Sequence, residues 1–275
     1  MADTTRRSVL KMAGASVAAL SLGGEALSAS QLPGQPGVCA PEAQSKAAPR
    51  VMAIAAHPGD TFFVMGAPVA VATHSGGSGF VLSLSLGEKG SADIPPAKYG
   101  AMQEKASNKA AEMLGATALF LHYGDGAIPD NDEAAFGVCD FIRQHKPDVV
   151  VTHWKGSWHK DHQACHHIVQ NAIFYAALPS FAREYPAHGV RSLYFADNWE
   201  DARDFVPDTY LDISAVYDQW LKACGVFPMW RGETGFRYND YYSSRAVGSG
   251  CLSGAKQAVA LMSAADQRIQ HVRSL

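Results

Sequence analysis

Short apolar runs alternate along the chain with segments of helical periodicity. Four of the apolar runs are expected to form strands, over residues 51–56, 79–86, 118–122 and 148–153. Runs of this length, bounded by turn residues, are typical of buried parallel strands. Helices are expected near 65–74 and 99–114, from Asn131 or Asp132 to about His145, and from about Asp161 to Ala177.

Four strand–helix units in series predict right-handed crossovers. The expected fold class is therefore α/β, with a Rossmann-like, mostly parallel sheet and helices on both faces. If the strand order is 3-2-1-4, the first and fourth strands flank the point where the connections reverse, and the loops that follow them converge on one crevice.

The last hundred residues, 178–275, are less regular. A strand is expected near 192–196, followed by helices near 213–224 and 240–262. We interpret this part as a C-terminal cap region that completes a substrate pocket. The sequence shows no internal repeat and no second domain boundary.

Two histidine motifs follow the first and fourth expected strands. The first is His57-Pro58-Gly59-Asp60 and the second is His159-Lys160-Asp161-His162. Two imidazoles and a carboxylate in one crevice would hold a metal ion through three protein ligands and leave one position open, as catalytic zinc requires. A histidine at a strand end can also be purely structural, but the His-x-x-Asp spacing on a sharp turn favours a ligand. The pattern indicates a metallohydrolase.

These motifs and several others resemble the PIG-L/LmbE family of zinc-dependent N-acetyl-sugar deacetylases. The resemblance covers roughly residues 50 to 262, and His57-Pro58-Gly59-Asp60 stands where the family has the sequence AHPDD. The further matching segments are 87–90 (GEKG), 123–126 (YGDG), 146–148 (KPD), 152–157 (THWKGS), 159–162 (HKDH), 194–201 (YFADNWED) and 241–242 (YY).

The resemblance implies that His57, Asp60 and His162 bind one Zn²⁺ per chain. It also implies that His159 polarises the substrate carbonyl or protonates the leaving amine, and that Asp161 orients His159. Zinc can lower the pKa of a bound water to about 7, so hydroxide for the attack on an amide is available at neutral pH.

Three features depart from the family pattern. Gly59 stands where the family has the aspartate that acts as general base. The acidic residue usual just after the motif is replaced by Thr61 and Phe62, and a glutamate common in the helix near 99–114 is replaced by Ala106. A positioned base typically contributes about 10²–10⁴-fold, so its loss predicts slow turnover, with His159 as a candidate for both base and acid.

Further residues are candidates for binding substrate. Asp125 is expected either to hydrogen-bond a sugar hydroxyl or to shape a turn between two glycines. Asn198, Trp199 and Glu200 suit a loop that lines a carbohydrate site, or else close the core of the cap region. His153 ends a strand near the site and is expected to lie beside the ligands. His166 and His167 are expected on the surface or in the core of the helix that follows, although His166 could share a helix face with His162.

Composition narrows the function classes. The chain has 275 residues, of which 47% are hydrophobic and 18% are charged, as in globular proteins. The net charge is −3 and no basic run is present, which argues against nucleic-acid binding. The expected partner is a small amino-sugar or glycoconjugate substrate, and the oligomeric state stays open. The loop after the first strand lacks G-x-G-x-x-G, which argues against dinucleotide binding.

None of the five cysteines forms a C-x-x-C pair, so the sequence does not support a structural zinc site. Cys139, Cys165 and Cys224 lie in apolar helical patterns and are expected to be small core residues. Cys39 lies in a segment rich in proline and glycine, and its partner, if it has one, is left open.

Residues 1–29 resemble a twin-arginine signal peptide, with Thr5-Arg6-Arg7-Ser8-Val9-Leu10-Lys11 before a weakly apolar stretch too short to span a bilayer. Residues 30–49 have the composition of a linker, and residues 50–275 form the expected deacetylase-like domain. The prediction is export to the periplasm or beyond, with no transmembrane segment in the mature chain; a basic tail before a cytosolic domain is the alternative.

The sequence thus predicts an exported metal-dependent hydrolase that removes an N-acyl group, acetyl in the first instance, from an amino sugar or glycoconjugate by attack of a zinc-activated water. The alternative is a catalytically degenerate member of the same family that binds a sugar-like ligand without turnover.

Overall fold

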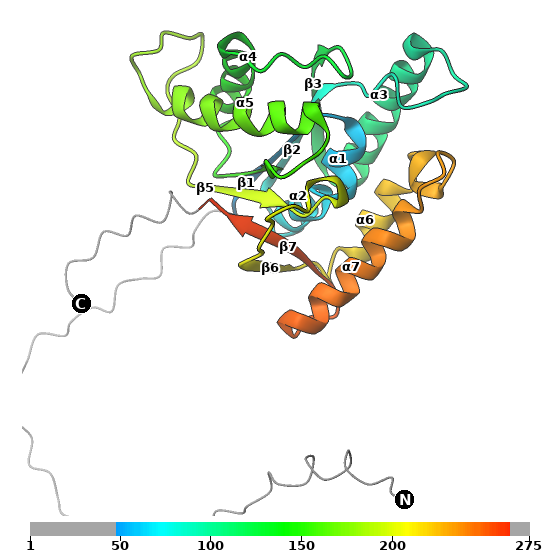
Figure 1. Cartoon of the computed structure of the whole chain (residues 1–275). Helices are drawn as coiled ribbons and strands as arrows, with labels where there is room; N and C mark the ends of the chain where they lie inside the picture. The colour runs from blue at the N-terminus through cyan, green and yellow to red at the C-terminus, as the bar shows by residue number, and fades with distance from the viewer. Residues whose placement is uncertain (1–47, 265–275) are drawn as a thin grey trace, which may run out of the picture. The chain divides into compact units, whose positions relative to one another are not determined.

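A computed structural model describes residues 48–264 of the chain (Figure 1). The strands are β1 (Arg50–Ala55), β2 (Ser78–Ser85), β3 (Ala116–Tyr123), β4 (Val149–His153), β5 (Ser192–Ala196), β6 (Thr209–Asp212) and β7 (Ala258–Ser263). The helices are α1 (Pro58–Phe63), α2 (Gly66–His74), α3 (Pro96–Met113), α4 (Asp132–His145), α5 (Lys160–Ala177), α6 (Tyr217–Cys224) and α7 (Tyr238–Ser253), with short 3₁₀ helices η1 (Trp199–Asp201) and η2 (Met229–Arg231).

The strands form one sheet in the order β3-β2-β1-β4-β5-β7-β6. β1 lies between β2 and β4 and is parallel to both, with Ala53 opposite Val81 on one side and Val151 on the other. β5 continues the parallel part. The predicted mostly parallel, Rossmann-like sheet and the predicted neighbourhood of the first and fourth strands are confirmed.

Each face of the sheet has its own hydrophobic core. α4 and α5 pack together over one face, where Ile168 of α5 belongs to the same core cluster as Met52 and Ile54 of β1. α1, α2, α3, α6 and α7 belong to the other face, where Phe62 and Trp220 are fully buried. Figure 1 shows α4 and α5 side by side, apart from α3, α6 and α7. The expected helices on both faces are confirmed.

α4 begins at the cap that the sequence predicts. The Asn131 side chain accepts a hydrogen bond from the backbone N–H of Ala134, which satisfies one of the free donors of the first turn. Of the two cap residues left open by the sequence, the structure selects Asn131.

The C-terminal part corrects one prediction. The helix expected over 240–262 ends at Ser253, because Gly254 adopts a left-handed conformation with φ of 81° and closes the helix. The apolar run Ala258–Ser263 then forms β7, which pairs antiparallel with both β5 and β6. The region expected to be only a cap therefore also extends the sheet, while its helix α7 faces the pocket described below. The helix expected from 213 begins at Tyr217.

Cys139, Cys165 and Cys224 are buried and free, as expected of core residues, and Cys251 is exposed. The predicted signal peptide, nearly all of the linker and Cys39 lie outside the described residues. Within residues 48–264, no helix is both long enough and apolar enough to cross a membrane.

Candidate metal and active site

The first histidine motif occupies the junction of β1 with α1, a short helix that the sequence did not predict. His57 has an extended backbone and stands at the N-cap, and Pro58 begins the helix, where its missing N–H costs nothing. One turn of helix then returns Asp60 to His57, and the distance from His57 Nδ1 to Asp60 Oδ2 is 3.1 Å.

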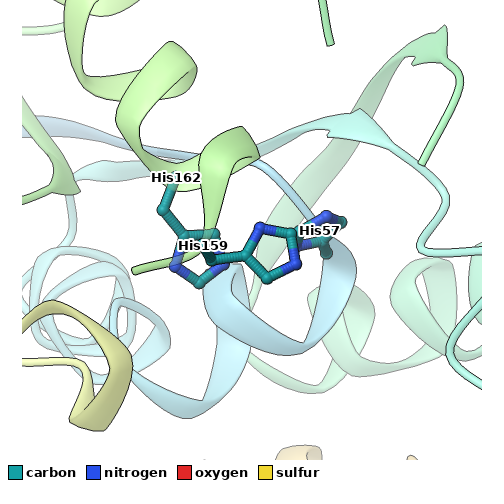
Figure 2. A group of neighbouring side chains, drawn as sticks. All are labelled: His57, His159 and His162. Atoms are coloured by element: carbon teal, nitrogen blue, oxygen red, sulfur yellow. The ribbon is translucent and has the colours of Figure 1, made fainter. Parts of the chain in front are cut away.

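The second motif begins α5, directly after β4. Because β4 is the neighbour of β1, both motifs leave the sheet at the same edge. His162 Nε2 lies 3.2 Å from Asp60 Oδ2, so a single carboxylate joins the two motifs. Figure 2 shows the imidazoles of His57, His159 and His162 side by side, with His57 coming from the first motif and the other two from the start of α5.

A buried carboxylate that the sequence reading did not single out, Asp201 in η1, holds two of the imidazoles. Its oxygens lie 2.9 Å from His162 Nδ1 and 2.8 Å from His153 Nδ1, and the side chain is completely buried. His153 Nε2 accepts the backbone N–H of Ala56, so its proton lies on Nδ1 and its ring supports the site from the end of β4. His153 thus lies beside the candidate ligands, as expected.

Two more carboxylates contact the second ring nitrogen of His57, Nε2. Asp125 Oδ1 and Asp161 Oδ2 each lie 3.3 Å from His57 Nε2. Asp161 also accepts the backbone N–H of Gly126 at 2.6 Å, and Asp125 accepts that of Lys89 at 2.9 Å. The turn expected around Asp125 is present, and its side chain faces the site.

The expected pairing of Asp161 with His159 is wrong. The Asp161 carboxylate lies against His57, and it is the Asp161 backbone N–H that donates to His159 Nδ1, at 3.2 Å. This happens because His159 is the N-cap of α5 and its ring accepts a free donor of the first turn. His159 Nδ1 is therefore an acceptor, and in the neutral ring the proton lies on Nε2.

The charges of the site are strongly coupled. Burial alone would lower the pKa of His57, but contacts with Asp125, Asp161 and Asp60 raise it well above its usual value. Burial likewise opposes protonation of His162, yet the charge of Asp60 and the contact with Asp201 raise its pKa to about 10. The neighbouring histidines hold the pKa of Asp60 well below its usual range, against the effect of burial. The carboxylates thus stabilise positive charge at the place where a cation is expected.

The donor set fits a divalent transition metal. His57 Nδ1, Asp60 Oδ2 and His162 Nε2 face one another, and the second nitrogen of each imidazole contacts a carboxylate, which is the usual way in which a protein orients metal-binding histidines. Three groups have ligand atoms within 4.8 Å of one another: His57 with His159 and His162, Asp60 with His153 and His162, and His57 with Asp125 and Asp161. Each of the three predicted ligands, His57, Asp60 and His162, occurs in at least one of these groups, but no single group contains all three.

A pocket of about 150 Å³ opens onto these residues. Its polar wall includes His57, Asp60, Asp125, His159 and Glu200, and its apolar wall includes Phe63, Met229, Tyr238 and Tyr242. Glu200 Oε2 is 3.6 Å from His162 Nε2. Burial and the nearby charge of Asp60 raise the pKa of Glu200 to about 7.

Gly59 also lines this pocket, on the buried side of α1. A Cβ atom at this position would lie 3.3 Å from Met229 Sδ and 3.4 Å from a ring carbon of Phe63. The space beside residue 59 is therefore taken by a thioether and an aromatic ring. The two residues that follow the histidine motif, Thr61 and Phe62, are fully buried in the core and do not replace the missing acid.

Asn198, Trp199 and Glu200 have three different roles. Glu200 lines the pocket, as expected of a substrate-binding residue. Asn198 is buried and does not line it; its amide donates to Asp60 Oδ1 at 3.0 Å, so it orients a predicted metal ligand. Trp199 is half-buried and does not line the pocket; its ring stacks on Phe236 at 4.8 Å.

The remaining histidines of α5 are structural, as expected. His166 is buried, with Nδ1 2.8 Å from the backbone oxygen of His153 and Nε2 2.7 Å from the Gln170 amide. His167 is exposed and pairs with Asp130. Neither belongs to the groups of potential metal ligands in the described part of the chain.

Fold and site together define an α/β protein with a candidate metal centre at the carboxyl edge of its sheet. Residues 52–173 match the family model described as PIG-L: GlcNAc-PI de-N-acetylase. The matched segment contains both histidine motifs, so the predicted resemblance to PIG-L/LmbE-like deacetylases is confirmed over these residues.

Two relatives in this family are similar to the chain. A 4-oxalmesaconate hydratase from Pseudomonas putida KT2440 is 27% identical over 177 residues, which cover 61% of this chain and 69% of the relative. A 1D-myo-inositol 2-acetamido-2-deoxy-alpha-D-glucopyranoside deacetylase from Catenulispora acidiphila is 27% identical over 186 residues, and the match covers 57% of each chain.

Solved structures show the same fold. The crystal structure of the 4-carboxy-2-hydroxymuconate hydratase from Pseudomonas putida KT2440 superposes with a TM-score of 0.72 at 22% identity, covering 82% of this chain and 99% of the other. At that identity the likeness supports the architecture only.

Proposed function

We propose that the chain is an exported, zinc-dependent hydrolase that removes an N-acyl group, acetyl in the first instance, from an amino sugar or glycoconjugate. The observation that carries the proposal is the convergence of His57, Asp60 and His162 from two motifs a hundred residues apart. The family match and the deacetylase relative support the same reaction class, a deacetylase-type hydrolase acting on C–N bonds.

His57 Nδ1, Asp60 Oδ2 and His162 Nε2 would hold the metal ion. When bound, Zn²⁺ supplies a Lewis acid for the acyl oxygen and lowers the pKa of a water molecule. Asn198 donates a hydrogen bond to Asp60, and Asp201 contacts His162, so these two residues keep two of the three ligand side chains in place.

His159 is the candidate hydrogen-bond donor that would stabilise the acyl oxygen. Its Nδ1 is occupied by the Asp161 backbone N–H, so Nε2–H points away from that bond and is free to donate to a substrate oxygen. A fixed donor of this kind stabilises the negative charge that develops when a carbonyl is attacked. The same hydrogen bond makes His159 a poor base, because its acceptor nitrogen is already used.

Glu200 suits the role that Gly59 cannot fill. The other pocket carboxylates, Asp60 and Asp125, have both oxygens in contact with histidine, amide or backbone donors. Within residues 48–264, no hydrogen bond holds the Glu200 carboxylate, which lies 3.6 Å from His162 Nε2. Glu200 accepts a proton from the attacking water as the C–O bond forms, and returns it to the amine nitrogen as the C–N bond breaks. The products are a carboxylic acid and a free amine.

The pocket chemistry distinguishes between the activities of the two relatives. Among the described residues, its lining contains Asp60, Asp125 and Glu200 but no lysine or arginine. An oxalmesaconate is a carboxylic acid anion, and away from the metal centre and its histidines such a substrate would meet carboxylates without a lysine or arginine to pair with it. A neutral N-acylated sugar avoids this repulsion, so the lining favours deacylation over hydration.

A catalytically degenerate protein that binds a sugar-like ligand without turnover is the second candidate. It is favoured by Gly59 and by the Met229 sulfur that occupies the adjacent space. In that case Glu200 contacts the ligand and takes no part in proton transfer.

The test is acetate and amine release from a panel of N-acetylated amino sugars by the zinc-loaded mature protein. We expect equal amounts of acetate and free amine, and loss of both on treatment with a chelator. Binding of these sugars without release of either product would support the degenerate candidate instead.

The proposed export rests on the leader sequence, in which Arg6 and Arg7 form part of a twin-arginine-like motif. We expect the unaltered precursor to appear in mature form outside the cytoplasm. The Arg6→Lys, Arg7→Lys double variant should remain inside as the precursor, and equal export of both proteins would contradict this route.

A further inference from the structure

The second ring nitrogen of His57 faces more negative charge than one proton can balance. Asp125 Oδ1 and Asp161 Oδ2 each lie 3.3 Å from His57 Nε2. When Nδ1 of this ring faces the proposed zinc ion, the neutral ring keeps a single N–H to donate. A carboxylate that orients a metal-binding histidine is usual, and one is enough for that role. Orientation of the ring therefore accounts for one of the two carboxylates and leaves the other unexplained.

The distances fit an ion among these three groups better than they fit hydrogen bonds. Hydrogen bonds between charged groups are typically about 2.7–2.9 Å long, whereas both contacts of His57 Nε2 measure 3.3 Å. Ligands about 2.0–2.2 Å from zinc at the corners of a tetrahedron lie about 3.3–3.6 Å apart. His57, Asp125 and Asp161 also form one of the groups with ligand atoms within 4.8 Å of one another.

In the described part of the chain, one oxygen of the Asp161 carboxylate has no hydrogen-bond partner. The side chain is fully buried, and its Oδ2 accepts the backbone N–H of Gly126 at 2.6 Å, but its buried Oδ1 accepts none. A buried carboxylate oxygen without a partner is costly, and in native proteins it commonly marks the place of an ion or a water molecule. This observation points to a ligand independently of the distances around His57.

Both carboxylates are held in place by backbone donors. Asp125 Oδ2 accepts the N–H of Lys89 at 2.9 Å, which leaves Oδ1 toward His57, and Asp161 is fixed by Gly126. The Lys89 ammonium contacts the backbone oxygen of Asp125 and not its carboxylate. Within residues 48–264, neither carboxylate forms an ion pair with a lysine or arginine. Carboxylates that are fixed by hydrogen bonds and lack a cationic side chain are prepared to bind a metal ion.

We propose that His57 Nε2, Asp125 and Asp161 form a second site for a divalent transition metal ion, Zn²⁺ in the first instance. The His57 ring then bridges two ions as an imidazolate, with Nδ1 toward the proposed catalytic ion and Nε2 toward the second ion. Binding replaces the Nε2–H bond with an Nε2–metal bond, and the proton leaves to solvent. The second ion is reached from the active-site pocket, because His57 and Asp125 line it. The inference rests on the proposed function only for the first ion.

The test counts zinc ions per chain by native mass spectrometry of the mature protein at increasing free zinc. We expect two ions in the unaltered protein, the second bound more weakly because its binding displaces a proton. Asp125→Asn removes a ligand and should lower the affinity for the second ion by roughly 10²-fold or more, while the first ion stays. Asp161→Asn should act in the same way, which keeps the test valid if Asp125→Asn does not fold.

Asp130→Asn is the matched control, because Asp130 is an exposed acid that pairs with the exposed His167. This variant should keep both ions. One ion per chain in the unaltered protein at every zinc concentration would overturn the proposal. So would a second ion that Asp130→Asn loses and Asp125→Asn retains, since that ion would lie on the surface beside His167.

Copper(II) tests the bridge itself. An imidazolate couples the unpaired electrons of two copper ions antiferromagnetically, so the protein loaded with two Cu²⁺ should give a weaker low-temperature EPR signal than two isolated ions. Asp125→Asn should give the full signal of its single ion. Two bound ions with the full signal of two isolated copper centres would show that they share no imidazole and would overturn the proposal.

Metal counts and EPR need no turnover, so they separate this inference from the proposed function. Two coupled ions in a protein that releases no acetate would support the second site while the hydrolase proposal fails. Chelator-sensitive acetate release by a protein that never binds more than one ion would have the opposite meaning.

Discussion

The floor and the mouth of the pocket are built in opposite ways. At the floor, side chains from α1, β4, α5 and η1 are largely buried and joined by charged hydrogen bonds, with Asp60 and Asp201 at the centre. Toward the mouth, Trp158, Trp199 and Phe236 are at least partly exposed and meet through ring contacts, and within residues 48–264 no hydrogen bond joins their side chains.

The difference separates two functions of one site. Buried charged hydrogen bonds fix side-chain positions to within a fraction of an ångström, which metal binding requires, and they fail sharply when one partner is removed. Aromatic surfaces contribute through area and tolerate a range of ligands. Changes at the floor should therefore have large effects on metal and chemistry, and changes at the mouth should have smaller effects confined to substrate choice.

The largest effect is expected from His162→Ala. The change removes one of three proposed ligands and leaves Asp60 and Asp201 without their shared imidazole. We expect zinc affinity to fall by roughly 10³-fold or more, and acetate release to fall with it. Metal content after dialysis and a chelator competition would measure the loss, with the exposed His167→Ala as control. Retention of full zinc content would show that His162 is not a ligand.

Glu200→Gln should separate chemistry from metal binding. The amide keeps the shape of the side chain but cannot accept a proton from water, so kcat should fall by about 10²–10⁴-fold. Zinc affinity and the free energy of unfolding should change little. If kcat survives while KM rises, Glu200 binds substrate and is not the base.

Asp201→Asn should act through the ligands that the carboxylate holds. One amide cannot accept from both His153 Nδ1 and His162 Nδ1 as the carboxylate does. Loss of such a partner typically costs about 10–100-fold in metal affinity. Competition with a chromophoric chelator would show it, and Asp212→Asn, an exposed acid that accepts from Ser214, should have no effect. Equal zinc affinity in the two variants would exclude a positioning role for Asp201.

Much of the floor could be predicted from the sequence because its signals are local. The apolar runs 51–56 and 148–153 marked β1 and β4, and their parallel pairing placed two motifs at one edge of the sheet. The spacing of His57 and Asp60 needs only one helical turn. Asp201 could not be identified in this way, because it is one acid among many until β5 and η1 bring it to His153 and His162.

The mouth was less predictable for a physical reason. Phe236 and Tyr238 are distant in sequence from the motifs and carry no spacing that marks them as ligands of anything. The end of α7 and the start of β7 were missed because Gly254 lies inside a pattern that otherwise continues as a helix. The resemblance implies that Asp161 orients His159, but the Asp161 carboxylate turns toward His57, which becomes its neighbour only in the folded chain.

The most direct test of the account compares the unaltered protein with Gly59→Asp, both loaded with zinc, in release of acetate from N-acetylated amino sugars. The new carboxylate must displace the Met229 sulfur, which lies only 3.3 Å from the new Cβ, so Gly59→Asp, Met229→Ala serves as the accommodating variant. Because Glu200 already supplies the base, we expect chelator-sensitive release by the unaltered protein and a change of less than about tenfold in either variant. Release by the aspartate-containing variants alone would contradict this account and show that the natural chain binds its ligand without turning it over.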